Sequence, residues 1–199
     1  MAHVEMFFDL SSPYSYLAST QVEQVARRAG ATFEAKPFVL GVVFQATGNR
    51  LPAAVAAKAA WMLNDLRAWA RDYAVPFRLN DCFPFNAMKA HRLILAVEEA
   101  ARWRVIQRCF RAFWSENADL ADDAVLARLL RECGLEAEKL LPRVEEADIK
   151  LALRANTDDA IARGAFGAPT FFVGGELFVG NDRLPFVERA ARGERVYRE

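Results

Sequence analysis

The first 38 residues of the chain carry the strand, helix and strand pattern of a β-α-β unit. Residues 3–8 are a short, mostly apolar run that predicts a strand, and residues 32–38 alternate like a second strand. Between them, residues 13–29 place apolar side chains at helical spacing, with Ser12 as the predicted N-cap and Pro13 at the first helical position. Because a crossover helix joins parallel strands, we expect the two strands to pair in parallel.

The rest of the chain is first helical and then returns to strands. Residues 170–173 and 176–179 flank a Gly-Gly pair and predict a β-hairpin, which a helix over residues 182–192 follows. Pro76 and Pro84 exclude a continuous helix over residues 76–85. The helices expected in the middle cover residues 52–74, 86–116, 122–133 and 145–163. This order predicts an α/β domain, residues 1–45 and 150–199, interrupted by an α-helical insertion domain, residues 46–149.

Composition excludes several classes of function. The 199 residues are 53% hydrophobic, which is enough for a large core without disulfides or metals. Lys and Arg number 26 and so do Asp and Glu, so the formal net charge is zero, which argues against a nucleic-acid binder. We expect neither a signal peptide nor a membrane span, because no basic start precedes an apolar run and no uncharged apolar stretch reaches about 18 residues.

Cysteine and histidine usage points to a reducing compartment and to no metal site. Cys82, Cys109 and Cys133 are an odd number of thiols without close spacing, so they predict no disulfide framework and favour a cytoplasmic location. His3 and His91 are far apart in the sequence and are interpreted as surface or half-buried structural residues.

Four polar segments could carry chemistry, and each has a plainer interpretation. Residues 48–50, with Lys58 one helical stretch later, could contribute to a site or could be a polar loop and a solvated lysine. As an N-cap, Ser12 would lie beside free backbone N–H groups that could lower the pKa of a thiol bound to it, or it could simply cap the helix. Pro169 stands just before the hairpin, where its peptide bond could be cis or trans. Asn181 and Asp182 could cap the last helix or could bind an ammonium and a carboxylate of a ligand.

Together, several motifs resemble the 2-hydroxychromene-2-carboxylate isomerase and kappa-class glutathione transferase family of the DsbA-like thioredoxin superfamily. The resemblance implies a thioredoxin-like fold interrupted by a large α-helical insertion domain. Relatives in that superfamily carry Cys-x-x-Cys where this chain has Ser12 and Ser15, which cannot form a disulfide, so a disulfide oxidoreductase is disfavoured. The segments that carry the resemblance are residues 8–18, 48–50, 64–66, 164–170 and 180–183.

The resemblance implies that glutathione is bound as a cofactor and that Ser12 is the catalytic residue, which hydrogen-bonds the sulfur and favours the thiolate. Asn181 and Asp182 would hold the γ-glutamyl end, and the Ala168 backbone would pair with the cysteinyl part. The implied glutathione-binding residues are Ser12, Pro13, Tyr14, Asn49, Lys58, Ala168, Pro169, Asn181 and Asp182. Lys58 would offer its charge to a carboxylate. The expected substrate-binding residues are Arg50, Trp61, Phe83 and Phe85, with Arg50 as the candidate partner for the substrate carboxylate.

The implied activity is isomerisation of 2-hydroxychromene-2-carboxylate, or a related aromatic-degradation intermediate, to trans-o-hydroxybenzylidenepyruvate. The glutathione thiolate would add to an unsaturated carbon, a single bond would rotate, and the thiolate would leave. Two alternatives stay open: a kappa-class-like glutathione transferase or peroxidase acting on electrophiles, and a non-catalytic thioredoxin-like binding protein. The partners are then glutathione and a small aromatic carboxylate, with no nucleic acid or membrane, and analogy with the family implies a homodimer.

Overall fold

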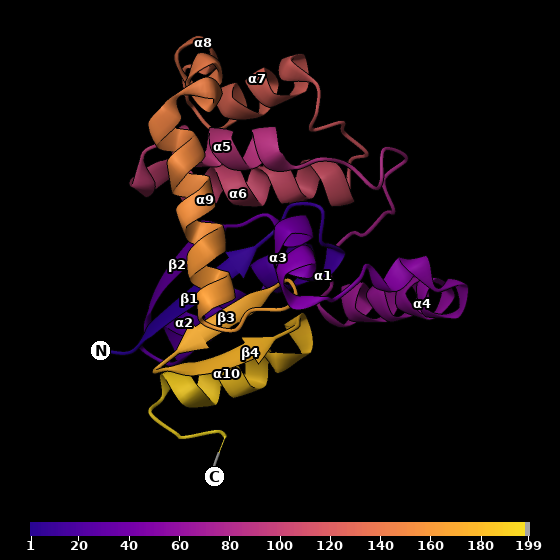
Figure 1. Ribbon diagram of the computed structural model, residues 1–199, viewed down its shortest axis with the longest axis vertical. Helices are drawn as coiled ribbons and strands as arrows, with labels where there is room; N and C mark the ends of the chain where they lie inside the picture. The colour runs from indigo at the N-terminus through magenta and orange to yellow at the C-terminus, as the bar shows by residue number, and fades with distance from the viewer. Residues whose placement is uncertain (198–199) are drawn as a thin grey trace.

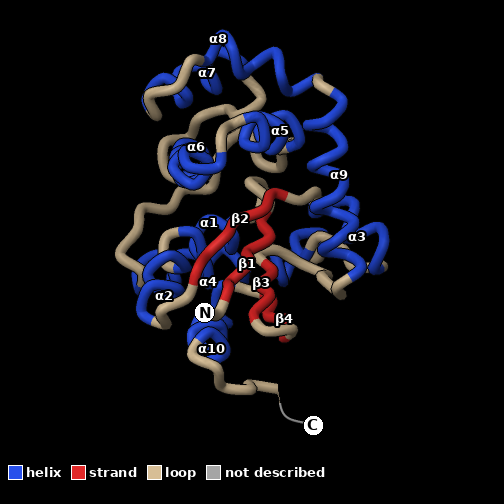
Figure 2. Tube along the Cα trace, turned by 90° about the vertical axis from the view of Figure 1, so that its left-hand side faces the viewer, coloured by secondary structure: helices blue, strands red, loops and turns tan. Residues whose placement is uncertain are grey.

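The computed structural model describes residues 1–197 and has a four-stranded sheet with helices on both faces (Figures 1 and 2). The strands are β1 (His3–Phe8), β2 (Thr32–Pro37), β3 (Thr170–Val173) and β4 (Glu176–Val179), in the order β2-β1-β3-β4. β1 and β2 pair in parallel, as predicted, and β3 pairs antiparallel with both β1 and β4. The predicted hairpin is therefore confirmed, and it lies beside the first strand of the chain.

Alternation along β1 divides the core between the two faces of the sheet. Val4, Met6 and Phe8 belong to the large cluster under α1 and α10, whereas Phe7 packs with Phe172 in a smaller cluster on the other face. Figure 2 shows α9 and α3 on the side of that smaller cluster. Because both faces are covered, β1 is buried along most of its length, and Asp9 and Leu10 in the turn that follows it are buried as well.

The single helix predicted over residues 13–29 is two helices, α1 (Pro13–Ser19) and α2 (Val22–Arg28). Hydroxyl side chains end α1, because Thr20 Oγ1 and Ser19 Oγ both donate to carbonyls of the last turn, each at 2.7 Å. The one-helix prediction was wrong because these side chains compete with the helix for its own carbonyls. Gly30, with φ +64°, then turns the chain into β2.

The helical region has more breaks than its sequence pattern predicts. The predicted helix over residues 86–116 divides at Val97, whose carbonyl accepts from the Arg102 guanidinium at 3.1 Å. The segment of residues 40–47, for which no helix was expected, forms α3. The elements here are α3 (Leu40–Thr47), a 3-10 turn (Pro52–Ala54), α4 (Ala56–Asp72), α5 (Met88–Ala96), α6 (Glu99–Trp114), α7 (Asp123–Glu132), α8 (Ala137–Leu140), a second 3-10 turn (Leu141–Glu145) and α9 (Ala147–Ala162).

Figure 1 shows α5 to α8 gathered at one end of the molecule, α4 projecting to the side, and α9 running from that end down to the sheet. A 3-10 turn (Asn181–Arg183) and α10 (Leu184–Ala191) close the chain after β4. None of the helices within residues 1–197 combines the length and the apolar character needed to cross a bilayer.

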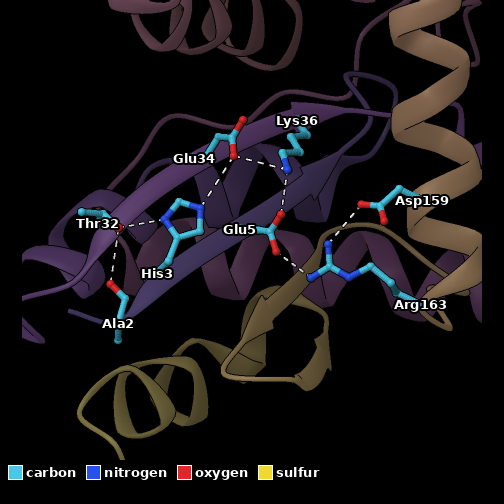
Figure 3. A network of polar contacts seen from close by, with 8 residues as sticks. All are labelled: Ala2, His3, Glu5, Thr32, Glu34, Lys36, Asp159 and Arg163. Atoms are coloured by element: carbon cyan, nitrogen blue, oxygen red, sulfur yellow. Dashed lines mark hydrogen bonds and ion pairs between the residues drawn. The ribbon is translucent and has the colours of Figure 1, made fainter.

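An ion-pair network ties α9 to the first two strands (Figure 3). Glu5 in β1 accepts from Lys36 Nζ at 2.7 Å and from Arg163 at 2.6 Å. The Arg163 guanidinium also lies over the Phe172 ring, 3.7 Å from its centroid. Although Glu5 lies close enough to His3 and Glu34 to share a metal ion with them, two cations already neutralise it, so the cluster is explained as an ion-pair network.

Candidate active site

A cavity of about 900 Å³ opens where the start of α1, the loop before β3 and the end of β4 meet α4. Residues from all of the predicted site segments reach it. The predicted site residues that line the cavity are Ser12, Pro13, Tyr14, Asn49, Trp61, Phe83, Phe85, Ala168, Asn181 and Asp182. Lys58, Arg50 and Pro169 are not among the lining residues; Lys58 and Arg50 are exposed.

Ser12 is the N-cap of α1, as predicted, and its hydroxyl lies in the cavity wall. The backbone is extended there (φ −93°, ψ 115°), and Oγ accepts the Ser15 N–H at 3.2 Å. The same Oγ donates to the carbonyl of Ala168 at 3.0 Å, and the Ala168–Pro169 peptide is cis. The hydroxyl therefore joins the start of α1 to the loop before β3 in the wall of the cavity.

The hydroxyls of the neighbouring Ser11 and Ser15 have different surroundings from the Ser12 hydroxyl. Ser11 Oγ donates to Asp9 Oδ1 at 2.7 Å, so its hydroxyl is committed to the turn. Ser15 is fully buried and lies outside the cavity lining. Ser11 and Ser12 both line the cavity, but of these three hydroxyls Ser12 is the one that reaches the loop before β3.

Asn181 and Asp182 do not cap the last helix, which answers one question that the sequence left open. Neither the 3-10 turn nor α10 has a side-chain cap. Asn181 is buried and its Nδ2 donates to the Tyr73 hydroxyl at 3.4 Å, whereas Asp182 is 44% exposed at the cavity rim. Both side chains therefore line the cavity instead of capping the helix, and Asp182 Oδ2 also lies 3.4 Å from the guanidinium of the adjacent Arg183.

Gly180 provides the space in which the Asp182 carboxylate lies. Its φ of +107° favours glycine, and a Cβ built there would be only 2.5 Å from Asp182 Oδ1. The Gly180 N–H donates to the Pro169 carbonyl at 2.9 Å, which joins this turn to the cis peptide. The position of the Asp182 carboxylate at the rim of the cavity therefore depends on the missing Cβ of Gly180.

Tyr14, one of the expected glutathione-binding residues, pairs in the cavity wall with Asp65, which was not among the predicted site residues. The Tyr14 hydroxyl donates to Asp65 Oδ2 at 2.8 Å. Burial raises the pKa of Tyr14, and the hydrogen bond to Asp65 and the charges of Asp65 and Asp182 raise it further, so the phenol stays protonated. The Asn64-Asp65-Leu66 motif was the available signal, but it does not show which group the acid meets.

Aromatic and aliphatic side chains form much of the cavity wall. Phe83 and Phe85 line it while they pack on the helical region, with ring centroids 5.6 Å from Trp114 and 4.1 Å from Phe113. Trp61 on α4 is 64% exposed at the mouth. Such a wall suits a flat, apolar molecule.

Asn49 closes the cavity near the end of α3. Its Nδ2 donates to the Phe166 carbonyl at 2.8 Å, so it ties the α3 loop to the segment before the cis peptide. Arg50 follows it directly but faces solvent, outside the lining. The expected substrate-carboxylate partner is therefore not brought into the cavity in this structure.

A family model described as the DSBA-like thioredoxin domain matches residues 3–192. The chain belongs to this family, which confirms the predicted fold. Within it, the chain groups with the 2-hydroxychromene-2-carboxylate isomerases and kappa-class glutathione transferases, as the motifs predicted.

Three comparisons show how far the similarity extends. A 2-hydroxychromene-2-carboxylate isomerase of Sphingobium xenophagum is 31% identical over 187 residues, which cover 93% of this chain and 95% of that protein. Glutathione S-transferase kappa 1 of Caenorhabditis elegans is 25% identical, covering 94% of this chain and 89% of that protein. A solved 2-hydroxychromene-2-carboxylate isomerase superposes with a TM-score of 0.87 at 27% identity, covering 94% and 93% of the two chains.

Proposed function

We propose that the protein is a glutathione-dependent isomerase of the 2-hydroxychromene-2-carboxylate isomerase type. The observation that carries the proposal is the Ser12 hydroxyl, which lies 3.0 Å from the Ala168 carbonyl in the wall of a cavity lined by both polar and aromatic side chains. Relatives with that name, and with the name of glutathione transferases, align over more than nine-tenths of this chain.

The polar lining residues suit glutathione. Asp182 offers a carboxylate to the γ-glutamyl ammonium, the Ala168 backbone offers strand-like pairing to the cysteinyl unit, and Gly180 leaves the acid its space. When bound, glutathione would supply a thiolate that adds reversibly to an unsaturated carbon, which frees a double bond to rotate. The chain itself needs to bind the tripeptide, hold its sulfur and exclude water.

Ser12 has a proton to offer to the sulfur once the tripeptide is in place. In the structure its hydroxyl donates to the Ala168 carbonyl. A cysteinyl N–H that pairs with the same carbonyl would free the Ser12 hydroxyl to turn toward the sulfur. A hydrogen bond to an ionised group contributes about 1.5–3 kcal/mol, which corresponds to a fall in thiol pKa of about 1–2. Since α1 has only seven residues, this hydroxyl, rather than a long helix dipole, is the main stabilising group.

A second candidate function is conjugation of glutathione to an apolar electrophile, and the aromatic lining and the absence of a cation among the described lining residues favour it. Among the described lining residues the charged side chains are Asp65 and Asp182, both near Tyr14, whereas Arg50 and Lys58 face solvent. A neutral aromatic acceptor therefore fits this wall as well as a carboxylate does. The two activities use the same thiolate, and they differ in whether glutathione is consumed.

The test is turnover of 2-hydroxychromene-2-carboxylate with and without glutathione, followed by absorbance of the trans product and by the concentration of free thiol. We expect glutathione-dependent product formation at constant thiol, with a loss of at least about 100-fold in Ser12→Ala. Ser11→Ala is the matched control, because that hydroxyl is bound to Asp9, and it should retain most activity.

Each other outcome selects a different function. Falling free thiol with an adduct as product would favour the transferase. Glutathione binding without turnover of either kind, and without an effect of Ser12→Ala, would leave the non-catalytic binding protein. Activity that survives in Ser12→Ala would refute the role of the hydroxyl.

A further inference from the structure

Two residues of the helical region hydrogen-bond the backbone of Leu10, in the turn that leads to Ser12. Leu10 donates its N–H to Nε2 of His91 in α5 at 3.0 Å. The Leu10 carbonyl accepts from Nε1 of Trp114, the last residue of α6, also at 3.0 Å. All three residues are fully buried, so water does not compete for either bond.

The bond to Leu10 fixes the state of the His91 ring. Because Nε2 accepts the hydrogen bond from the Leu10 N–H, it carries no proton of its own, and the ring is neutral with its proton on Nδ1. Burial lowers the pKa of His91, which the nearby charge of Asp9 opposes, so the neutral form persists. Among the described residues, the buried Nδ1 of His91 has no hydrogen-bond partner, which is unfavourable. An apolar side chain at this position would avoid that penalty, so the presence of a histidine calls for another explanation.

Asp9 makes further hydrogen bonds within the turn and to the start of α3. The Asp9 carboxylate accepts from the Ser11 N–H at 2.8 Å and from the Leu40 N–H at 2.9 Å, and the Asp9 carbonyl accepts the Ser12 N–H at 2.9 Å. Ser12 can therefore shift only if this set of bonds breaks. Hydrogen-bond strength falls steeply with distance and angle, so small shifts of Oγ matter to a bound sulfur.

We propose that His91 and Trp114 are positioning residues: by holding the N–H and the C=O of Leu10, the helical region sets the Ser12 hydroxyl at the distance that stabilises a bound thiolate. The inference rests on the proposed function for the identity of the thiol. It gives the helical region a role in the chemistry of the sulfur, in addition to forming the aromatic wall.

The test compares a variant that loses the acceptor with one that keeps it. His91→Leu removes the acceptor at similar volume, whereas His91→Gln places an amide oxygen close to the position of Nε2. In His91→Leu we expect Leu10 amide exchange to accelerate at least about tenfold, and the pKa of the bound glutathione thiol to rise by about 1, a tenfold loss of thiolate. His91→Gln should recover most of both values.

Two further measurements separate positioning from simple destabilisation. The Kd of S-methylglutathione, which has no thiol, should change by less than about twofold in His91→Leu, because the peptide-binding groups are untouched. Leu129→Ala is the control for lost core packing, since this buried α7 residue lies away from the turn, and it should leave the thiol pKa unchanged. Trp114→Phe removes the donor to the Leu10 carbonyl and should raise the thiol pKa in the same direction, which keeps the test available if His91→Leu does not fold.

The inference is overturned if Leu10 exchange accelerates while the thiol pKa stays at its wild-type value, or if Leu129→Ala raises that pKa equally. Unchanged Leu10 exchange in His91→Leu also overturns it. A wild-type protein that binds no glutathione refutes the proposed function instead, and faster Leu10 exchange in His91→Leu would then still show that His91 holds the turn.

Discussion

Acid should weaken the fold through Glu5, at the centre of the network that ties α9 to the sheet (Figure 3). Burial alone would raise the pKa of Glu5, but hydrogen bonds from Arg163 and Lys36, together with their charges, lower it from 4.5 to about 2. A carboxyl whose pKa is lower in the folded than in the unfolded chain stabilises the fold above the unfolded value. Its contribution is therefore complete at neutral pH and is lost as pH falls from about 4.5 to about 2.

The magnitude follows from the difference in pKa. A difference of about 2.5, at about 1.36 kcal/mol for each unit, gives an upper limit of about 3.4 kcal/mol. The side chains of Glu5, Lys36 and Arg163 are 18%, 24% and 32% exposed, so solvent screening reduces the expected contribution to about 1–2 kcal/mol. Glu5→Gln should lose this amount in the free energy of unfolding at neutral pH.

Urea unfolding of wild type and Glu5→Gln between pH ~7 and pH ~3 measures the effect. The difference between the two proteins should shrink as pH falls, because wild-type Glu5 becomes protonated as well. Glu34→Gln is the matched control: Glu34 is 41% exposed and 3.3 Å from the same Lys36, so its loss should stay below about 0.5 kcal/mol. A difference that does not depend on pH, or one no larger than that of Glu34→Gln, would refute the reasoning.

Two more predictions concern the site and the thiols. Gly180→Ala would place a Cβ against the Asp182 carboxylate and should weaken glutathione binding at least about tenfold. Gly175→Ala is the control: at φ +89° and with open space around it, it should lower stability without changing the Kd for glutathione. Equal Kd values in the two variants would contradict the role of Gly180. Under native conditions a thiol reagent should modify exposed Cys82 rapidly and spare Cys109, whose pKa burial raises to about 12; rapid labelling that survives Cys82→Ser would contradict this.

The sequence predicted the elements whose signals are local. Alternation in residues 3–8 and the Gly-Gly hairpin located the strands, and Ser12-Pro13 located the start of α1. The helix boundaries that failed depend on side-chain contacts that no period reveals. At the break between α5 and α6, the Arg102 guanidinium donates to the Val97 carbonyl. At the end of α1, the Ser19 and Thr20 hydroxyls donate to carbonyls of the last turn.

The start of α3 depends on contacts between segments far apart in the chain. Leu40 donates its N–H to Asp9, and Val39 donates its N–H to Thr157 Oγ1 at 3.1 Å. Neither contact has a signature within residues 38–47, where Gly41 and β-branched residues argue against a helix. The tertiary fold overrides the weak local preference.

The sequence predicted which residues meet at the cavity better for the expected glutathione-binding residues than for the expected substrate-binding residues. Motif spacing brought Ser12 and Asp182 correctly to one cavity, because both follow strands of the same sheet. Arg50 and Lys58 lie on exposed segments around the start of α4, and their direction could not be read from spacing. His91 looked like a surface or half-buried helix residue, yet it is the acceptor under the Ser12 turn.

The pKa of the bound glutathione thiol, measured by thiolate absorbance across a pH titration, tests the role of Ser12 most directly. In the wild-type complex it should lie about 1–2 below the ordinary value of about 8.5, and Ser12→Ala should raise it by at least about 1. Ser11→Ala should leave it at the wild-type value. A thiol pKa that is equal in the wild type and Ser12→Ala, with glutathione bound in both, would contradict thiolate stabilisation by this hydroxyl.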